Sequence, residues 1–297
     1  MSQRLLVTGA AGHLGRRVVE ILLEKNAGHI VATTRDPSKL ADLAARGVEV
    51  RVADFDKPET LASAFAGVDR LLLISTDAMH VAGQRLSQHK AAIAAAEEAG
   101  VKHIVYTSLP APQPSSDNPV ETDHFWTELA IATSSMSWTF MRHALYADTL
   151  PWRLPQALAS GKLVSATGNR GRHFVTREDC AHADAAVLAS PDTTDRIYEV
   201  TGPAAITFDE IAAIASELTG KPLVHVAVDA DKFRAGLAAA GAPPVMIKIM
   251  TGFDVATALG FHGTVTPVVK DLTGREPTSV RDYLVSNKAA LDGVAGH

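Results

Sequence analysis

The sequence is poor in cysteine, which limits the chemistry that it can carry. Its 297 residues include one cysteine, Cys180, so an internal disulfide and a multi-cysteine metal or redox motif are both excluded. A single cysteine fits a reducing compartment, and we expect Cys180 to be a small buried side chain.

Basic residues are not in surplus either. The 28 Lys and Arg residues face 33 Asp and Glu residues, which gives a formal charge of -5. A dedicated nucleic-acid binder needs excess positive charge to neutralise phosphates. The composition therefore argues against a nucleic acid as partner.

Long apolar runs and paired histidines are also missing. No stretch approaches the about 18 apolar residues of a membrane-spanning helix, and Met1–Arg4 leads into a strand-like segment without a signal-peptide core. We therefore expect a cytoplasmic protein that has no membrane partner. The 12 histidines form no HxH, HxxxH or HExxH pair, so no metal site is expected.

What the sequence does have is a regular alternation of apolar, β-branched runs with amphipathic helical patterns. This pattern is typical of βαβ units, and it predicts an α/β protein built on a doubly wound parallel sheet that is covered on both faces. The predicted strands are Arg4–Thr8, Ile30–Thr34, Val48–Ala53, Arg70–Ser75, Ile104–Ser108 and Trp138–Arg142.

The second half of the chain is less regular. We assign residues 1–150 to the sheet domain and residues 151–297 to a smaller domain, from which the run Ile197–Thr201 returns to the sheet as a further strand. A capping-box pattern begins at Thr207 and predicts a helix that ends at Thr219.

A Pro/Ser-rich segment, Pro110–Pro119, directly follows the fifth predicted strand. A loop at the carboxyl end of a parallel strand is where a substrate cover would lie.

Three glycines follow the first predicted strand, in the segment Thr8-Gly9-Ala10-Ala11-Gly12-His13-Leu14-Gly15. Gly9 permits a tight turn, Gly12 lets the backbone approach a pyrophosphate at the helix N-terminus, and Gly15 lets the helix pack closely. The pattern predicts a dinucleotide-binding turn, and the alternative is a glycine-rich turn without a ligand.

Arg35 stands at the end of the second strand, where such proteins contact the adenosine ribose. A carboxylate there favours NAD, whereas a guanidinium can bind the 2′-phosphate of NADPH. A charge-assisted contact of roughly 1.5–3 kcal/mol would favour NADPH over NADH by about ten- to a hundredfold. Asp36 is the competing residue, but it precedes Pro37 and fits a helix N-cap. Asp54, at the end of the third strand, can border the adenine or cap a helix.

The order and spacing of these segments resemble the NmrA-like atypical short-chain dehydrogenases/reductases, and within that family the bacterial NAD(P)H-dependent quinone oxidoreductases and triphenylmethane reductases. The segments that carry the resemblance are Val7–Leu23, Val31–Ser75, Ala99–Leu109, His124–Leu129 and Trp138–Asp148.

The resemblance implies a Rossmann domain with a smaller substrate-covering domain, NADPH in the crevice, and direct hydride transfer to an electron-poor aromatic or quinonoid acceptor. Together with the glycine pattern it gives the expected cofactor-binding residues, which are Thr8, Gly9, Ala11, Gly12, His13, Leu14, Gly15, Arg35, Asp54, Ser75, Thr107 and Ser108.

The sequence departs from the family at its proton donors. Short-chain dehydrogenases protonate the substrate through a Tyr-x-x-x-Lys pair, and none of the four tyrosines has a lysine four residues later. The lysine that some relatives carry after the residue matching His124 is replaced by Leu129, and the relatives' Arg-Asn pair reads Arg142-His143.

These absences bear on the substrate. Reduction of a ketone leaves an alkoxide about as basic as hydroxide, with a conjugate acid near pKa 16, and a positioned acid accelerates that step roughly 10²–10⁴-fold. Reduction of a quinone leaves a phenolate-like oxygen of pKa near 10, which solvent can protonate later. The sequence therefore favours quinones and cationic dyes over ketones.

Several side chains remain candidates for assisting the reaction. Tyr146, His143 and Ser108 are the candidate catalytic residues, although each can equally be a packing or capping residue. The expected substrate pocket includes Tyr146, His124, Trp152 and Phe174, beneath the loop Pro110–Pro119.

We therefore predict an NADPH-dependent oxidoreductase, with NADH a weaker cofactor, that acts on a small aromatic or quinonoid molecule between two domains. One alternative is an NADP(H)-binding redox sensor that turns over no substrate. A second is a carbonyl or carbon–carbon double-bond reductase with His143 or Tyr146 as an unconventional acid. A homodimer is compatible with the sequence.

Overall fold

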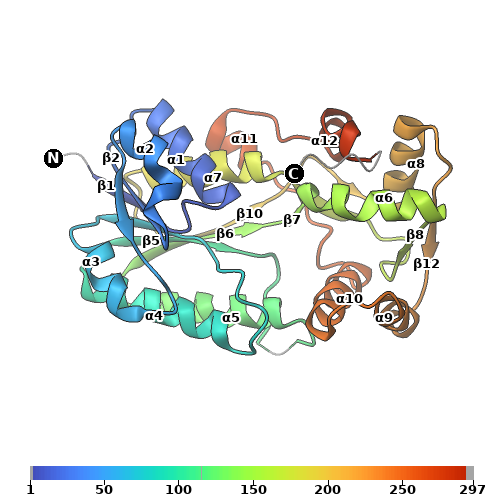
Figure 1. Cartoon of the computed structure of the whole chain (residues 1–297), viewed down its shortest axis with the longest axis horizontal. Helices are drawn as coiled ribbons and strands as arrows, with labels where there is room; N and C mark the ends of the chain where they lie inside the picture. The colour runs from blue at the N-terminus through green and yellow to red at the C-terminus, as the bar shows by residue number, and fades with distance from the viewer. Residues whose placement is uncertain (1–2, 115, 292–297) are drawn as a thin grey trace.

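A seven-stranded sheet, parallel throughout, forms the centre of the computed structural model, which describes residues 3–114 and 116–291 (Figure 1). Its strands follow the order β10 (Arg196–Val200), β6 (Ser137–His143), β5 (His103–Ser108), β4 (Arg70–Leu73), β1 (Arg4–Val7), β2 (His29–Thr34) and β3 (Glu49–Val52). The predicted doubly wound α/β fold is confirmed. The predicted strand Ile197–Thr201 is β10, which pairs with β6 at one edge.

Helices cover both faces of this sheet (Figure 1). One face carries α1 (His13–Glu24), α2 (Ala41–Ala45), α7 (Arg177–Ala189) and α11 (Val268–Thr273). The other carries α3 (Leu61–Phe65), α4 (Gln84–Glu98) and α5 (Pro119–Ala132). Short 3-10 turns precede α2, α3 and the second part of the chain, namely η1 (Pro37–Leu40), η2 (Pro58–Thr60) and η3 (Ala147–Thr149).

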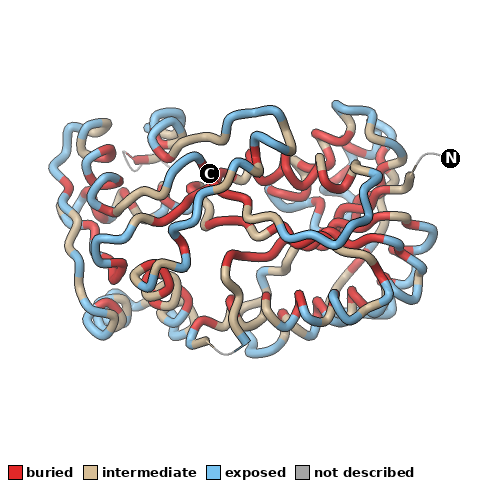
Figure 2. Tube along the Cα trace, turned by 180° about the vertical axis from the view of Figure 1, so that it is seen from behind, coloured by how far each residue is buried: buried red, intermediate tan, exposed pale blue. Residues whose placement is uncertain are grey.

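The strands divide the interior into two cores because successive side chains of a strand point to opposite faces. Leu5 and Val7 pack beneath α1 and α7, whereas Leu6 packs beneath α3 and α4. The buried residues accordingly concentrate along the sheet in Figure 2. At the edge, β3 is less covered than the sequence predicts, since Val52 is 48% exposed. Cys180 is fully buried in the first core, as expected.

A second, smaller set of elements lies beyond β6 (Figure 1). It contains a three-stranded sheet of β7 (Leu145–Tyr146), β9 (Arg172–Val175) and β11 (Ala205–Ile206), and a two-stranded sheet of β8 (Lys162–Ser165) and β12 (Val224–Ala227). Its helices are α6 (Leu150–Ser160), α8 (Phe208–Thr219), α9 (Ala230–Ala239), α10 (Pro244–Ala258), α12 (Val280–Ser286) and α13 (Lys288–Leu291). A third core forms here around Phe208.

The helix predicted to end at Thr219 is α8. Its capping box is complete, because the Thr207 hydroxyl accepts from the Glu210 N–H while the Glu210 carboxylate accepts from the Thr207 N–H. None of the helices within residues 3–114 and 116–291 is both long and apolar enough to cross a membrane.

A buried ion pair ties α10 to β9. Arg172 donates to Asp254 at 2.8 Å, and the second Asp254 oxygen accepts from the Ala166 N–H at 2.8 Å. Both side chains are almost completely buried. Removing one partner would leave the other charge buried and unpaired, which costs far more than the pair itself contributes.

Replacing Asp254 with Ala is therefore expected to lower the free energy of unfolding by about 3–5 kcal/mol, as measured by urea denaturation. Asp231→Ala is the matched control, because Asp231 pairs with Arg234 on an exposed face of α9 and surface pairs contribute about 0–1 kcal/mol. Equal losses for the two variants would show that the buried pair does not hold α10 in place.

Candidate functional site

A cleft of about 540 Å³ opens at the carboxyl ends of β1, β2, β3, β4 and β5. Chain segments that leave a parallel sheet at this edge commonly form its ligand site. Ten of the predicted cofactor-binding residues line the cleft, namely Gly9, Ala11, Gly12, His13, Leu14, Gly15, Arg35, Asp54, Ser75 and Thr107.

The glycine-rich turn forms the floor of the cleft between β1 and α1. Gly9 has a φ of +60°, a conformation that side chains rarely adopt. A Cβ on Gly15 would lie 2.5 Å from the Gly9 carbonyl oxygen, so only glycine lets α1 approach the turn this closely. No side chain caps the first turn of α1, and its free N–H groups can therefore bind an anion.

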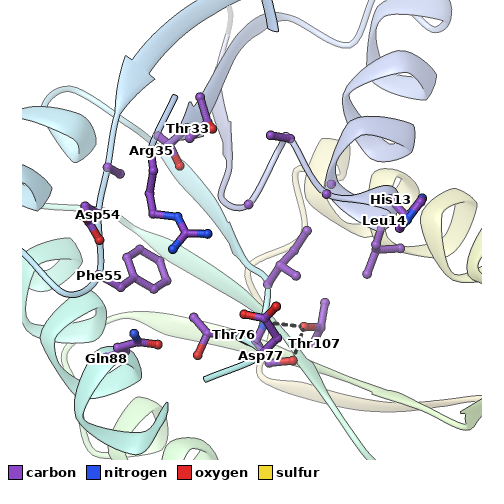
Figure 3. A pocket seen from close by; sticks show the side chains of 18 of the residues that line it. His13, Leu14, Thr33, Arg35, Asp54, Phe55, Thr76, Asp77, Gln88 and Thr107 are labelled. Carbon is purple, nitrogen blue, oxygen red and sulfur yellow. Dashed lines mark hydrogen bonds between the residues drawn. The ribbon is translucent and has the colours of Figure 1, made fainter. Parts of the chain in front are cut away.

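Cationic and aromatic side chains meet at the end of the cleft beyond β2 and β3. The Arg35 guanidinium points into the cleft, toward the ring of Phe55 (Figure 3), and Lys39 also lines this end. Asp36 accepts from the Ser38 N–H as the N-cap of η1, as predicted. Asp54 lines the cleft, and its carboxylate also accepts from the Asp56 N–H.

Hydrogen bonds hold together the strand ends in the middle of the cleft. The Ser75 N–H donates to the Thr107 hydroxyl at 2.9 Å, which links β4 to β5. Thr8 is buried and does not line the cleft. Its hydroxyl accepts from the Ile74 N–H and donates to the Leu72 carbonyl, so Thr8 fixes the course of the chain beyond β4.

Two buried polar side chains on α4, Arg85 and His89, hydrogen-bond to the backbone of Thr76, the residue that follows Ser75. The Thr76 N–H donates to Nε2 of His89 at 3.0 Å, and Arg85 donates to the Thr76 carbonyl at 2.7 Å. Arg85 also donates to Nε2 of His124 at 2.8 Å, while Nδ1 of His124 contacts the Tyr106 hydroxyl. His124 therefore belongs to this buried hydrogen-bond network and does not line the cleft, where a substrate-binding residue was expected.

At the far end, Tyr146 and Arg177 line the cleft. The Arg177 guanidinium carbon lies 4.9 Å from the centre of the Tyr146 ring and 5.9 Å from that of Trp152. Trp152 is 75% exposed and does not itself line the cleft, but its ring contacts Arg177, which does. His143 is buried directly behind Tyr146, with its Nδ1 3.0 Å from the tyrosine hydroxyl.

Two other candidates are placed away from the cleft lining. Ser108 is buried and donates to Glu128 at 2.6 Å, and Glu128 in turn pairs with Arg142 at 2.7 Å. Phe174 packs in the third core beside Phe208. The segment Pro110–Pro119, of which residue 115 lies outside the described residues, contributes no described residue to the lining either.

Sequence reasoning missed many of the lining residues, which are Thr33, Thr34, Lys39, Ala53, Phe55, Asp56, Ile74, Thr76, Asp77, Gln88 and Arg177. Most of them directly end or follow a parallel strand, and that position was the available signal. Arg177, Gln88 and Lys39 come from helical elements, and no local pattern marked them. No group of three or more metal-ligating side chains occurs in the described part of the chain.

The sheet order, the uncapped glycine-rich turn and the cleft at the carboxyl edge define a Rossmann-type α/β protein. The chain belongs to the NmrA-like family, whose model matches residues 1–284. The family resemblance predicted from the sequence is thus confirmed.

Several similar proteins are oxidoreductases that match over almost their whole length. Quinone oxidoreductase 2 of Escherichia coli is 33% identical, over 94% of this chain and 96% of that protein. The structure of Escherichia coli NADPH-dependent quinone oxidoreductase in complex with NADPH is 34% identical with a TM-score of 0.87, covering 95% of this chain and 99% of that one. Citrobacter sp. triphenylmethane reductase in complex with NADP(H) is 35% identical with a TM-score of 0.84, covering 95% and 99%.

From the two buried histidines of the network around Thr76, His89 and His124, we predict a pH dependence of the free energy of unfolding. Burial, with a contribution from Arg85, lowers the pKa values of His89 and His124 well below 6.5. The unfolded chain therefore takes up protons near pH 6.5 that the folded protein does not bind. Stability is full above pH 6.5 and falls with decreasing pH, by up to about 1.4 kcal/mol per pH unit for each histidine.

Urea denaturation between pH 7 and pH 5 measures this slope. His89→Gln keeps a neutral acceptor for Thr76 and is expected to reduce the slope. His80→Gln, which replaces an exposed imidazole, is expected to leave it unchanged. Identical slopes in wild type and His89→Gln would contradict the assignment.

Proposed function

We propose that the protein is an NADPH-dependent oxidoreductase that transfers hydride to a quinone or a similar electron-poor aromatic acceptor. The observation that carries the proposal is one continuous cleft that joins an uncapped, glycine-rich helix N-terminus to a pair of cationic side chains, Arg35 and Lys39. The similarity to reductases that bind NADPH or NADP(H) supports it.

The residues present suit each part of the cofactor. The first turn of α1, around Gly12 and His13, would hold the pyrophosphate, and Arg35 with Lys39 would hold the 2′-phosphate. The ring of Phe55 would border the adenine, and the Ser75–Asp77 segment would line the path toward the nicotinamide. When bound, NADPH supplies the hydride, while the protein orients it and limits access of water.

Two arguments favour a quinonoid acceptor. The chain lacks the Tyr-x-x-x-Lys pair, and a quinone needs no strong acid during hydride transfer because the oxygen left behind has a pKa near 10. The exposed indole of Trp152, next to Arg177, offers a flat surface on which an aromatic acceptor can stack.

Consumption of NADPH by the purified protein tests the proposal. The acceptors are a panel of quinones, a triarylmethane dye and simple ketones, with NADH in parallel and cofactor binding followed by nicotinamide fluorescence. We expect turnover of quinone or dye at rates above the protein-free reaction. Tight NADPH binding without turnover of any acceptor would contradict the proposal and favour a redox sensor.

Arg35 gives a separate prediction on cofactor choice. Arg35→Asp is expected to raise the Kd for NADPH by about ten- to a hundredfold more than the Kd for NADH, because only NADPH loses a charge-assisted contact of roughly 1.5–3 kcal/mol. Arg46→Asp is the matched control, since Arg46 is exposed and does not line the cleft. Equal losses for the two cofactors in Arg35→Asp would refute the role of Arg35.

A further inference from the structure

Tyr146 and two buried side chains behind it, from three different elements, form a continuous hydrogen-bonded line. The Tyr146 hydroxyl on β7 lies 3.0 Å from Nδ1 of His143 on β6. Nε2 of the same imidazole lies 2.9 Å from Oδ1 of Asp184 on α7. Tyr146 lines the cleft, whereas His143 and Asp184 are buried, so the line leads from the interior to the acceptor end.

The chemistry of the three groups fixes the direction of the hydrogen bonds. An ionised carboxylate only accepts, so Nε2 of His143 carries a proton toward Asp184. The neutral imidazole then accepts the Tyr146 hydroxyl proton at Nδ1. In the imidazolium form both nitrogens donate, and the Tyr146 proton is free to point into the cleft.

Asp184 holds the imidazole of His143 from the interior side, through the hydrogen bond to Nε2. Its carboxylate is fully buried, and Oδ2 has no hydrogen-bond partner in the described part of the chain. Among the described residues, the side chain that Asp184 contacts is His143, and this hydrogen bond offsets part of the cost of burying the carboxylate.

The surroundings of Tyr146 keep the phenol protonated. Burial raises the pKa of Tyr146 well above 10, and nearby Cys180 and Asp184 raise it further, while Arg177 acts in the opposite direction. Asp148, on η3, also faces this group. A phenol that holds its proton at neutral pH can donate it to a strongly basic oxygen.

We propose that Asp184, His143 and Tyr146 form a proton-delivery chain, and that it extends the acceptors from quinones to conjugated carbonyl compounds whose reduction leaves an enolate or alkoxide. Tyr146 is the catalytic acid, and His143 and Asp184 are positioning residues that act through it. This inference rests on the proposed function, since it needs a hydride donor in the cleft.

The step balances in protons and electrons. As the hydride adds to the conjugated carbonyl compound, an electron pair moves onto its oxygen, which takes the proton from the Tyr146 hydroxyl. The imidazolium of His143 passes its Nδ1 proton to Tyr146 and becomes neutral, still bonded to Asp184 through Nε2. A proton from bulk solvent then restores the imidazolium, so each acceptor molecule consumes one hydride and one solvent proton.

The chain can be tested first without any cofactor, by ¹⁵N NMR of histidine-labelled protein. His143→Asn identifies the His143 signals, which are expected to report a protonated Nε2 and an accepting Nδ1 in the neutral form. Tyr146→Phe is expected to shift the Nδ1 signal, and Asp184→Asn to change the balance between the two tautomers. Unchanged His143 signals in both variants would overturn the chain.

Steady-state kinetics test its role in delivery. For a conjugated ketone we expect Tyr146→Phe to lower kcat by about 10²–10⁴-fold, the range for loss of a general acid, and to abolish the solvent deuterium isotope effect. The loss for 1,4-benzoquinone is expected to be at least tenfold smaller. Asp184→Asn is expected to lower kcat for the ketone while leaving the Kd for NADPH unchanged.

Tyr198→Phe is the matched control, because Tyr198 lies on β10 outside the cleft, and it is expected to keep both activities. Equal losses for the two acceptors in Tyr146→Phe, or a wild type that reduces quinone but no conjugated ketone, would overturn the delivery chain alone. A wild type that reduces neither acceptor would overturn the proposed function as well.

Discussion

The close approach of α1 to the turn after β1 is the contact on which the cleft depends. At Gly15 a Cβ would lie 2.5 Å from the Gly9 carbonyl oxygen, so a larger residue would push the helix away from the sheet. That position directs the uncapped N-terminus of α1 at the cleft, where its N–H groups are available to an anion. Arg35 and Lys39 then add positive charge at the other side of the same opening.

The same helix also packs against the element that positions the far end of the cleft. α1 packs against α7 in one core, and Arg17 on α1 pairs with Glu178 on α7 at 2.8 Å. α7 begins with Arg177, whose guanidinium lies over the Tyr146 ring. The same helix carries the buried Asp184, which hydrogen-bonds to His143. One pair of packed helices thus positions both the glycine-rich turn and the side chains at the far end of the cleft.

Local sequence patterns predicted those features of the structure that depend on residues close together in the chain. The strands, the glycine-rich turn, the Asp36 cap and the position of Arg35 all follow from short segments, and the structure has each of them. Ser108 shows the limit, because successive strand residues alternate in direction: Thr107 faces the cleft, so Ser108 faces Glu128 on α5. Asp184 lies 41 residues from His143 along the chain, and such a contact depends on helix packing that no local pattern encodes.

The proposed function requires that the cleft support hydride transfer from NADPH and not only its binding. The most direct test is an anaerobic stopped-flow measurement with NADPH deuterated at C4 and 1,4-benzoquinone as acceptor. We expect one hydroquinone formed per NADPH consumed, at a rate above the protein-free reaction and slowed by the deuterium. NADPH that binds but stays reduced, with no hydroquinone formed, would contradict it.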